Sequence, residues 1–267
     1  MNIGKKLLSL LTVFCLTLSL VPTVALAADS SKSIKLSPSY SSSSLLEMVN
    51  EDNTTYYTGS SVVTTQPNSW KAKYEPTTNT LTLNEYKSGT IDVKNTDLKI
   101  DLNETDNTVT CGYRGITVWN GSLTITGPGK LELSGQPSNG TAIYAKASMT
   151  IQGGAKVTAT GGPLGQAIHA EGGTLTITGS GTEVTANKGG NKCSIKSGSD
   201  KVKGTINLND GAKLNADASS ISGSFKVNGS SNTFVDGMIA ETVSTTYTVS
   251  GTVMDASGRA INGATVQ

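Results

Sequence analysis

The sequence predicts an all-β fold, a right-handed parallel β-helix in which about six coils of three short strands stack into a solenoid. Three stretches carry this prediction, since each contains an apolar-x-apolar triplet three times with Gly, Ser, Asn or Pro between the triplets: residues 115–134, 142–160 and 167–186. The matching isoleucines Ile116, Ile143 and Ile168 lie 27 and 25 residues apart. Outside the extreme N-terminus no helix-period segment of ten or more residues occurs, and short apolar and polar alternation is typical of strands.

The same spacing continues on both sides of the three clear copies, which gives the count of six coils. Their first strands begin at Ile91, Ile116, Ile143, Ile168, Ile195 and Ile221. A second and a third triplet follow within a coil, as in Leu123/Ile125 and Leu131/Leu133. A repeat of this length made of short strands cannot bury its apolar face alone, so successive copies must stack. Leucine-rich and propeller repeats fit less well, because the first needs a Leu/Asn consensus and the second about 40 residues per blade.

Residues 1–27 have the pattern of a secretory signal peptide. Lys5 and Lys6 form its charged end, residues 7–20 are its apolar run, and residues 25–27 (Ala-Leu-Ala) supply the small residues of a cleavage site. An uncleaved membrane anchor needs about 20 apolar residues and fits less well. We therefore expect a secreted, extracellular protein, either released or held at the cell surface, with no membrane insertion after cleavage.

Three further segments complete the predicted domain organisation. Residues 28–61 are rich in Ser and read as a linker, and residues 62–240 form the β-helix domain. Its first part, with Trp70, Tyr74 and the alternating Thr80–Leu83, is expected to cap the open end of the solenoid, because an uncovered coil exposes core residues and unpaired strand edges. Residues 247–267 give two alternating strands around a turn, and then the sequence stops.

The charge balance argues against a nucleic-acid partner. Of the 21 basic residues, Lys5 and Lys6 belong to the signal, which leaves 19 against 20 acidic residues and no basic block. We expect the mature protein to be a monomer.

One face of the predicted solenoid collects the candidate binding residues. Side chains alternate between the two faces of a strand, so in the first strand of each coil the isoleucines point inward and their neighbours outward. The outward set contains the only His of the chain with two aromatic and four charged residues: Trp119, Tyr144, His169, Lys94, Lys146, Glu171 and Lys196. Aromatic rings suit the C–H face of a sugar, and Lys and Glu can bond its hydroxyls or pair with uronate carboxylates. The alternative is that the rings only stabilise neighbouring coils, as cross-strand pairs do.

Two resemblances to known families follow from these motifs. The run from about Trp70 to Val235, with LTITG starting at Leu123 and Leu175 and Ala-Ile-x-Ala at Ala142 and Ala167, resembles the carbohydrate-binding β-helix domains of secreted and surface proteins in Gram-positive bacteria. Those domains are related in architecture to pectate lyases. The resemblance implies a polysaccharide partner, of an acidic plant type, sometimes bound with calcium. Residues 247–267 resemble the truncated start of an immunoglobulin-like, carboxypeptidase regulatory-like domain.

A non-catalytic role is the preferred interpretation. A lyase on this scaffold would need clustered carboxylates to hold calcium and a basic residue such as Lys146 or Lys196. The outward carboxylates Asp92 and Glu171 lie three coils apart, roughly 14 Å at the usual strand spacing, so one calcium ion cannot bridge them. No cofactor is expected. Whether calcium binds is left undecided at this point, and no residue is assigned as a metal ligand. The alternatives are a passive spacer or adhesin stalk on the cell surface and, less favoured, a pectate-lyase-like enzyme.

Overall fold

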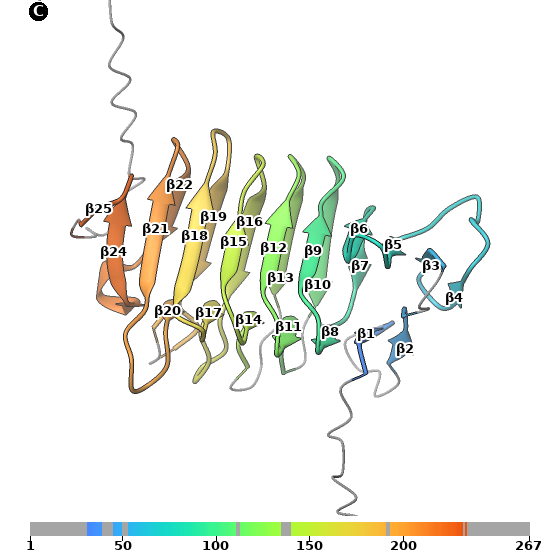
Figure 1. Cartoon of the computed structure of the whole chain (residues 1–267), viewed down its shortest axis with the longest axis horizontal. Helices are drawn as coiled ribbons and strands as arrows, with labels where there is room; N and C mark the ends of the chain where they lie inside the picture. Colours follow the sequence, from blue (N-terminus) through green and yellow to red (C-terminus); the bar gives the residue numbers. More distant parts are fainter. Residues whose placement is uncertain are drawn as a thin grey trace, which may run out of the picture.

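Three long sheets, wound from one repeated coil, form the body of the protein. The computed structural model describes residues 31–38, 45–49, 53–110, 113–134, 140–190, 193–231 and 233. Nearly every regular element in these ranges is a strand, and the strands belong to sheets of eight, six and eleven members. The coils lie side by side in chain order along the long axis of the molecule (Figure 1). The predicted all-β solenoid is therefore confirmed.

Each complete coil contributes one parallel strand to each sheet. Sheet A takes the first strand of every coil: β8 (Ile91–Lys94), β11 (Ile116–Trp119), β14 (Ile143–Ala145), β17 (Ile168–Ala170), β20 (Ile195–Ser197) and β23 (Ile221–Ser222). Sheet B takes the second: β9 (Leu98–Asp101), β12 (Leu123–Thr126), β15 (Met149–Ile151), β18 (Thr174–Thr178), β21 (Thr205–Asn209) and β24 (Ser224–Val227). Sheet C takes the third: β10 (Asp106–Thr110), β13 (Lys130–Ser134), β16 (Lys156–Thr160), β19 (Glu183–Asn187) and β22 (Lys213–Ala216). The short β7 (Lys87–Ser88), which precedes the first coil, pairs in parallel with β10 at the start of this sheet.

The coil count is slightly lower than predicted. Five coils have all three parallel strands, whereas the sixth has only the two-residue β23 and the four-residue β24. A short 3-10 helix, η1 (Ala218–Ser220), precedes β23, and β25 (Ser230–Ser231) runs antiparallel to β24. The stack therefore makes about five turns, because pairing in the last coil becomes antiparallel after its second strand.

The core is a set of apolar columns that run through the coils. Strand pairing places Ile116 on Ile91, Ile143 on Ile116 and Ile168 on Ile143. Ile195 and Ile221 continue the column. All members except the half-buried terminal Ile221 are fully buried. Residues that match in the repeat therefore lie directly above one another, with a rise near 4.8 Å per coil.

The corners between strands are tight and stack in the same way. Asn95 and Asn120 occupy equivalent corners with φ of 57° and 60°, a left-handed conformation that asparagine tolerates. The side-chain amide of Asn120 donates to the side-chain oxygen of Asn95 at 3.0 Å. Gly121 follows, and a Cβ placed there would lie 2.1 Å from the carbonyl oxygen of Thr96 in the coil below. This corner therefore requires glycine because two backbones meet there.

The first coil is capped by six strands that lie near β7 and β8 (Figure 1). They are β1 (Ser33–Leu36), β2 (Leu46–Glu47), β3 (Thr55–Tyr57), β4 (Val62–Val63), β5 (Ala72–Glu75) and β6 (Thr80–Leu83). In sheet A, β1 runs antiparallel to β8 and β2 antiparallel to β1. In sheet B, β6 is parallel to β9, whereas β5, β3 and β4 add antiparallel strands beyond it. An N-terminal strand cap is thus present, and it begins earlier in the chain than Val62.

The predicted linker over residues 28–61 needs correction in its described part. Three strands form there, and Ile34, Leu36, Met48 and Tyr57 are fully buried in the core. Their burial has a physical cause, because the edge strand β8 has unpaired backbone groups that β1 satisfies. One short alternating segment among many serines is too weak a pattern to reveal this pairing.

Two predicted segments lie outside the described residues: the signal peptide over 1–27 and the regulatory-like segment over 247–267. In the part of the chain that is described, no helix is long and apolar enough to cross a membrane.

Candidate functional site

The seven predicted site residues all lie on the outward face of sheet A, in two parallel columns. Strand pairing aligns the first column as Asp92, Thr117, Tyr144, His169 and Lys196. The second column starts with Lys94 and Trp119, which are directly paired, and Lys146 and Glu171 occupy the equivalent place in the next two coils. The structure therefore brings together residues that are up to about a hundred positions apart in the chain.

Trp119, Tyr144 and His169 form an aromatic ladder across three coils. The ring centroids of Trp119 and Tyr144 are 5.3 Å apart, and those of Tyr144 and His169 are 5.4 Å apart. The second pair meets edge to face at 74°, a favoured arrangement of aromatic rings. Trp119 is fixed further by its indole N–H, which donates to Asp92 Oδ1 at 2.9 Å.

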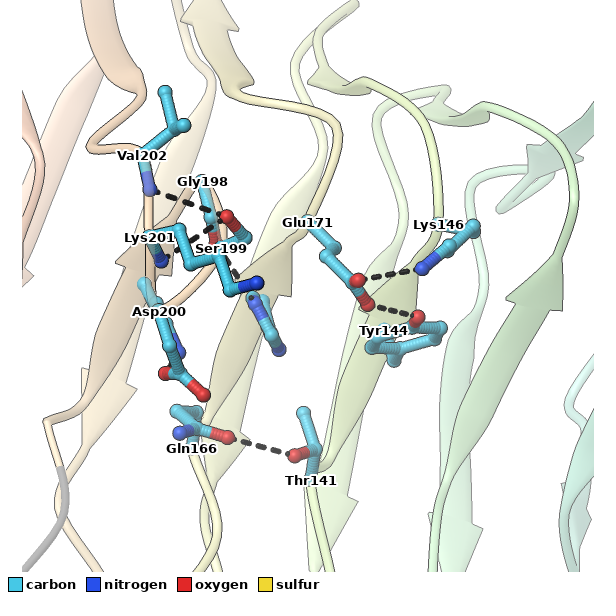
Figure 2. A network of polar contacts seen from close by, with 12 residues as sticks. Thr141, Tyr144, Lys146, Gln166, Glu171, Gly198, Ser199, Asp200, Lys201 and Val202 are labelled. Atoms are coloured by element: carbon cyan, nitrogen blue, oxygen red, sulfur yellow. Dashed lines mark hydrogen bonds and ion pairs between the residues drawn. The ribbon is translucent and has the colours of Figure 1, made fainter.

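Glu171 connects the two columns. Its carboxylate accepts hydrogen bonds from the Tyr144 hydroxyl and, at 2.5 Å, from Lys146 Nζ (Figure 2). These bonds from Lys146 and Tyr144 lower the pKa of Glu171 below its ordinary value. Burial raises the pKa of Tyr144, and the bond to Glu171 raises it further. Glu171 is therefore a carboxylate and Tyr144 a neutral phenol near pH 7.

A turn after β20 closes the far end of the ladder. His169 Nε2 lies 3.1 Å from the carbonyl oxygen of Gly198, and burial lowers the pKa of the His169 ring. Ser199 Oγ accepts from the backbone N–H groups of Lys201 and Val202, which tightens the turn (Figure 2). Lys196 forms an ion pair with Asp200 in the same turn. These contacts hold the His169 ring against the turn.

Arg114 belongs to the site, although it was not predicted from the sequence. It precedes β11, and its guanidinium carbon lies 4.6 Å from the ring centroid of Trp119 and 5.0 Å from that of Tyr144. Such distances are those of cation–π contacts. The sequence signal is weak because Arg114 lies outside the strand triplets, where the alternation rule assigns no face.

Exposure differs along the ladder in a way that changes the binding surface. Tyr144 is only 5 % exposed, so its ring faces are covered by its neighbours and offer no platform for a sugar. Trp119 and His169 are half-buried, while Lys94 and Lys146 are exposed. Tyr144 thus points outward as predicted, but its ring is not accessible to solvent. Its alternation places it outward, but the packing of Trp119, His169 and Arg114 covers it.

The described residues contain no group of three or more His, Cys, Asp or Glu side chains arranged to hold a metal ion. Asp92 and Glu171, the two carboxylates of the face, are engaged by Trp119 and by Tyr144 with Lys146. No protein-family model, no curated protein and no solved structure matches this chain. The solenoid fold is thus shown by the coordinates, and the expected kinship with pectate-lyase-like domains is not.

Proposed function

We propose that the outward face of sheet A binds a polysaccharide and that the protein is a non-catalytic, secreted or cell-surface binding module. The observation that carries the proposal is the strand register. It aligns Trp119 with Lys94 in one coil pair and Tyr144, His169 and Lys196 in the next, on one continuous face. A rise near 4.8 Å per coil is close to the length of one sugar residue, so an extended glycan laid along the stack meets a new side chain at every coil.

The chemistry of this face suits a hydroxyl-rich ligand. Trp119 offers a half-exposed aromatic surface for the C–H face of a sugar, and the Tyr144 ring in the next coil packs against it. Lys94 and Lys146 flank this surface as exposed ammonium groups that can donate to hydroxyl or carboxylate oxygens. The resemblance to bacterial carbohydrate-binding β-helix domains supports the same assignment, with an acidic plant-type polysaccharide as one ligand class.

A passive spacer on the cell surface is the second candidate. The burial of Tyr144 favours this candidate, because aromatic rings that pack against one another can have the sole role of holding neighbouring coils together. The two candidates differ in what Trp119 contributes. As a sugar platform it affects binding, whereas as a packing residue it affects only stability.

Binding to a panel of immobilised neutral and acidic polysaccharides tests the proposal. We expect the protein to bind at least one of them, and Trp119→Ala to weaken that binding about tenfold, which corresponds to about 1.4 kcal/mol. The matched control is Trp70→Ala in the cap, where the ring packs against Tyr56 with centroids 6.3 Å apart. This control should leave binding unchanged.

The other outcomes are equally specific. Binding to none of the polysaccharides would refute the proposal and favour the spacer. Release of an unsaturated product that absorbs in the ultraviolet would identify a lyase and would also refute it.

A further inference from the structure

Arg114 covers the aromatic surface that the proposed function assigns to the ligand. Its guanidinium carbon lies 4.6 Å from the Trp119 ring centroid and 5.0 Å from that of Tyr144. A planar guanidinium stacks on aromatic faces in this way and is attracted by them. A sugar ring cannot lie on the ring surfaces under the guanidinium while Arg114 occupies them.

The cover is incompletely bonded. Within the described part of the chain, Arg114 Nη1 is buried and has no hydrogen-bond acceptor, and the same holds for Thr117 Oγ1 on the strand that follows. Thr117 is only 2 % exposed, and in its column it lies between Asp92 of the preceding coil and Tyr144 of the following coil. A buried donor without an acceptor is destabilising by an amount comparable to the attraction of such stacking. The closed position of Arg114 is therefore only weakly favoured.

Two of the three other cations of the face have carboxylate partners, and the third, Lys94, is exposed. Lys146 bonds Glu171 at 2.5 Å, and Lys196 forms an ion pair with Asp200. Asp92 accepts the Trp119 indole N–H, and no carboxylate in the described residues forms an ion pair with Arg114. Arg114 is thus the cation of this face that has stacking contacts and a vacant donor but no anionic partner.

We propose that Arg114 is a charge-selective cover that makes the site specific for sugars carrying an oxyanion, either a carboxylate or a sulfate. Such a group attracts the guanidinium and satisfies its vacant N–H donors, with bidentate geometry that suits a planar anion. As Arg114 turns toward the anion, it uncovers Trp119 for the sugar ring. A neutral sugar has no anionic group to bond the guanidinium, so it must displace Arg114 from Trp119 without a new ion pair in return. This inference rests on the proposed function, since it concerns the selectivity of the same face.

The test compares matched polymers that differ in charge. Polygalacturonate is measured against its fully methyl-esterified form, and dextran sulfate against dextran, so that the two arms separate a carboxylate from a sulfate ligand. We expect the wild-type protein to prefer the charged member of at least one pair by about tenfold or more. Arg114→Ala should reduce this ratio to nearly one, with neutral binding unchanged or stronger. Lys99→Ala, which removes an exposed cation from sheet B, is the control and should retain the preference.

A second measurement reports the cover directly. In a Trp70→Phe background Trp119 is the only tryptophan, and acrylamide quenching of selectively excited tryptophan fluorescence then measures how accessible its ring is. Arg114→Ala should increase quenching in the free protein, and circular dichroism should confirm that the variant is folded. Unchanged quenching, or an unchanged charge ratio in a protein that still binds glycans, would overturn the inference alone. Failure to bind any polymer would overturn the proposed function and the inference together.

Discussion

Replacement of Ile168 by alanine should lower the free energy of unfolding by about 3–4 kcal/mol. Ile168 lies in the middle of the isoleucine column of sheet A, between Ile143 and Ile195, and is fully buried. The substitution removes three carbons from the core. At about 0.8 kcal/mol per buried methylene the transfer contribution is about 2.5 kcal/mol, and the residual cavity adds the rest. The closed stack of coils leaves little room for the neighbours to collapse into the space.

Two variants calibrate this magnitude. Ile168→Val removes one carbon and should cost about 1 kcal/mol. Ile221→Ala removes the same atoms as Ile168→Ala, but Ile221 is half-buried in the incomplete last coil. This substitution should therefore lower the free energy of unfolding by only about 1–2 kcal/mol. The cost of an identical substitution should therefore fall from the middle of the column toward its end.

The assay is equilibrium unfolding in urea, followed by far-ultraviolet circular dichroism and by tryptophan fluorescence. Coincident transitions from the two signals would show that the coils unfold together, which the comparison of free energies requires. A cost of Ile221→Ala equal to or larger than that of Ile168→Ala would refute the reasoning. It would mean that burial in the column does not set the stability of a coil.

Three further predictions concern other parts of the fold. Gly121→Ala should lower the free energy of unfolding by about 1–3 kcal/mol, because the alanine Cβ would lie 2.1 Å from the Thr96 carbonyl oxygen. Calorimetry should show this as a lower melting temperature. Glu171→Gln should destabilise the protein at neutral pH but not in acid. The folded-state pKa of Glu171 is lowered, so its carboxylate stabilises the fold above the ordinary glutamate pKa, and this stabilisation is lost as the pH falls through the lowered value. Urea midpoints of wild type and Glu171→Gln that differ by the same amount at every pH would contradict this. Leu36→Asp should detach β1 from β8 and produce oligomers in size-exclusion chromatography, whereas a purely monomeric profile would show that this edge needs no cover.

The repeat made most of the solenoid predictable. Spacing of the isoleucines defined which residues stack, and alternation within each triplet defined which side chains point inward, as the buried columns confirm. Both features are local properties of the sequence. The same logic predicts that Trp119, Tyr144 and His169 share one face, and their rings do contact one another there.

Features that depend on long-range packing could not be predicted in this way. Pairing of β1 with β8 joins residues almost sixty positions apart, without a repeat to signal it. Alternation gives the direction of Tyr144 but not its burial, which depends on Arg114 folding back from a segment between strands. Sequence patterns thus define the columns, while the contacts that decide accessibility come from side chains outside them.

The reversed direction of β1 has a consequence for assembly of the molecule. A stack of parallel coils is a template on which a second copy could continue, and repeated addition would yield an endless filament. Because β1 runs antiparallel to β8, the outer backbone groups of β8 are already paired with a strand of the wrong polarity for another coil. A coil of a second copy therefore cannot pair in parallel with β8, so β8 does not act as a template for continued stacking.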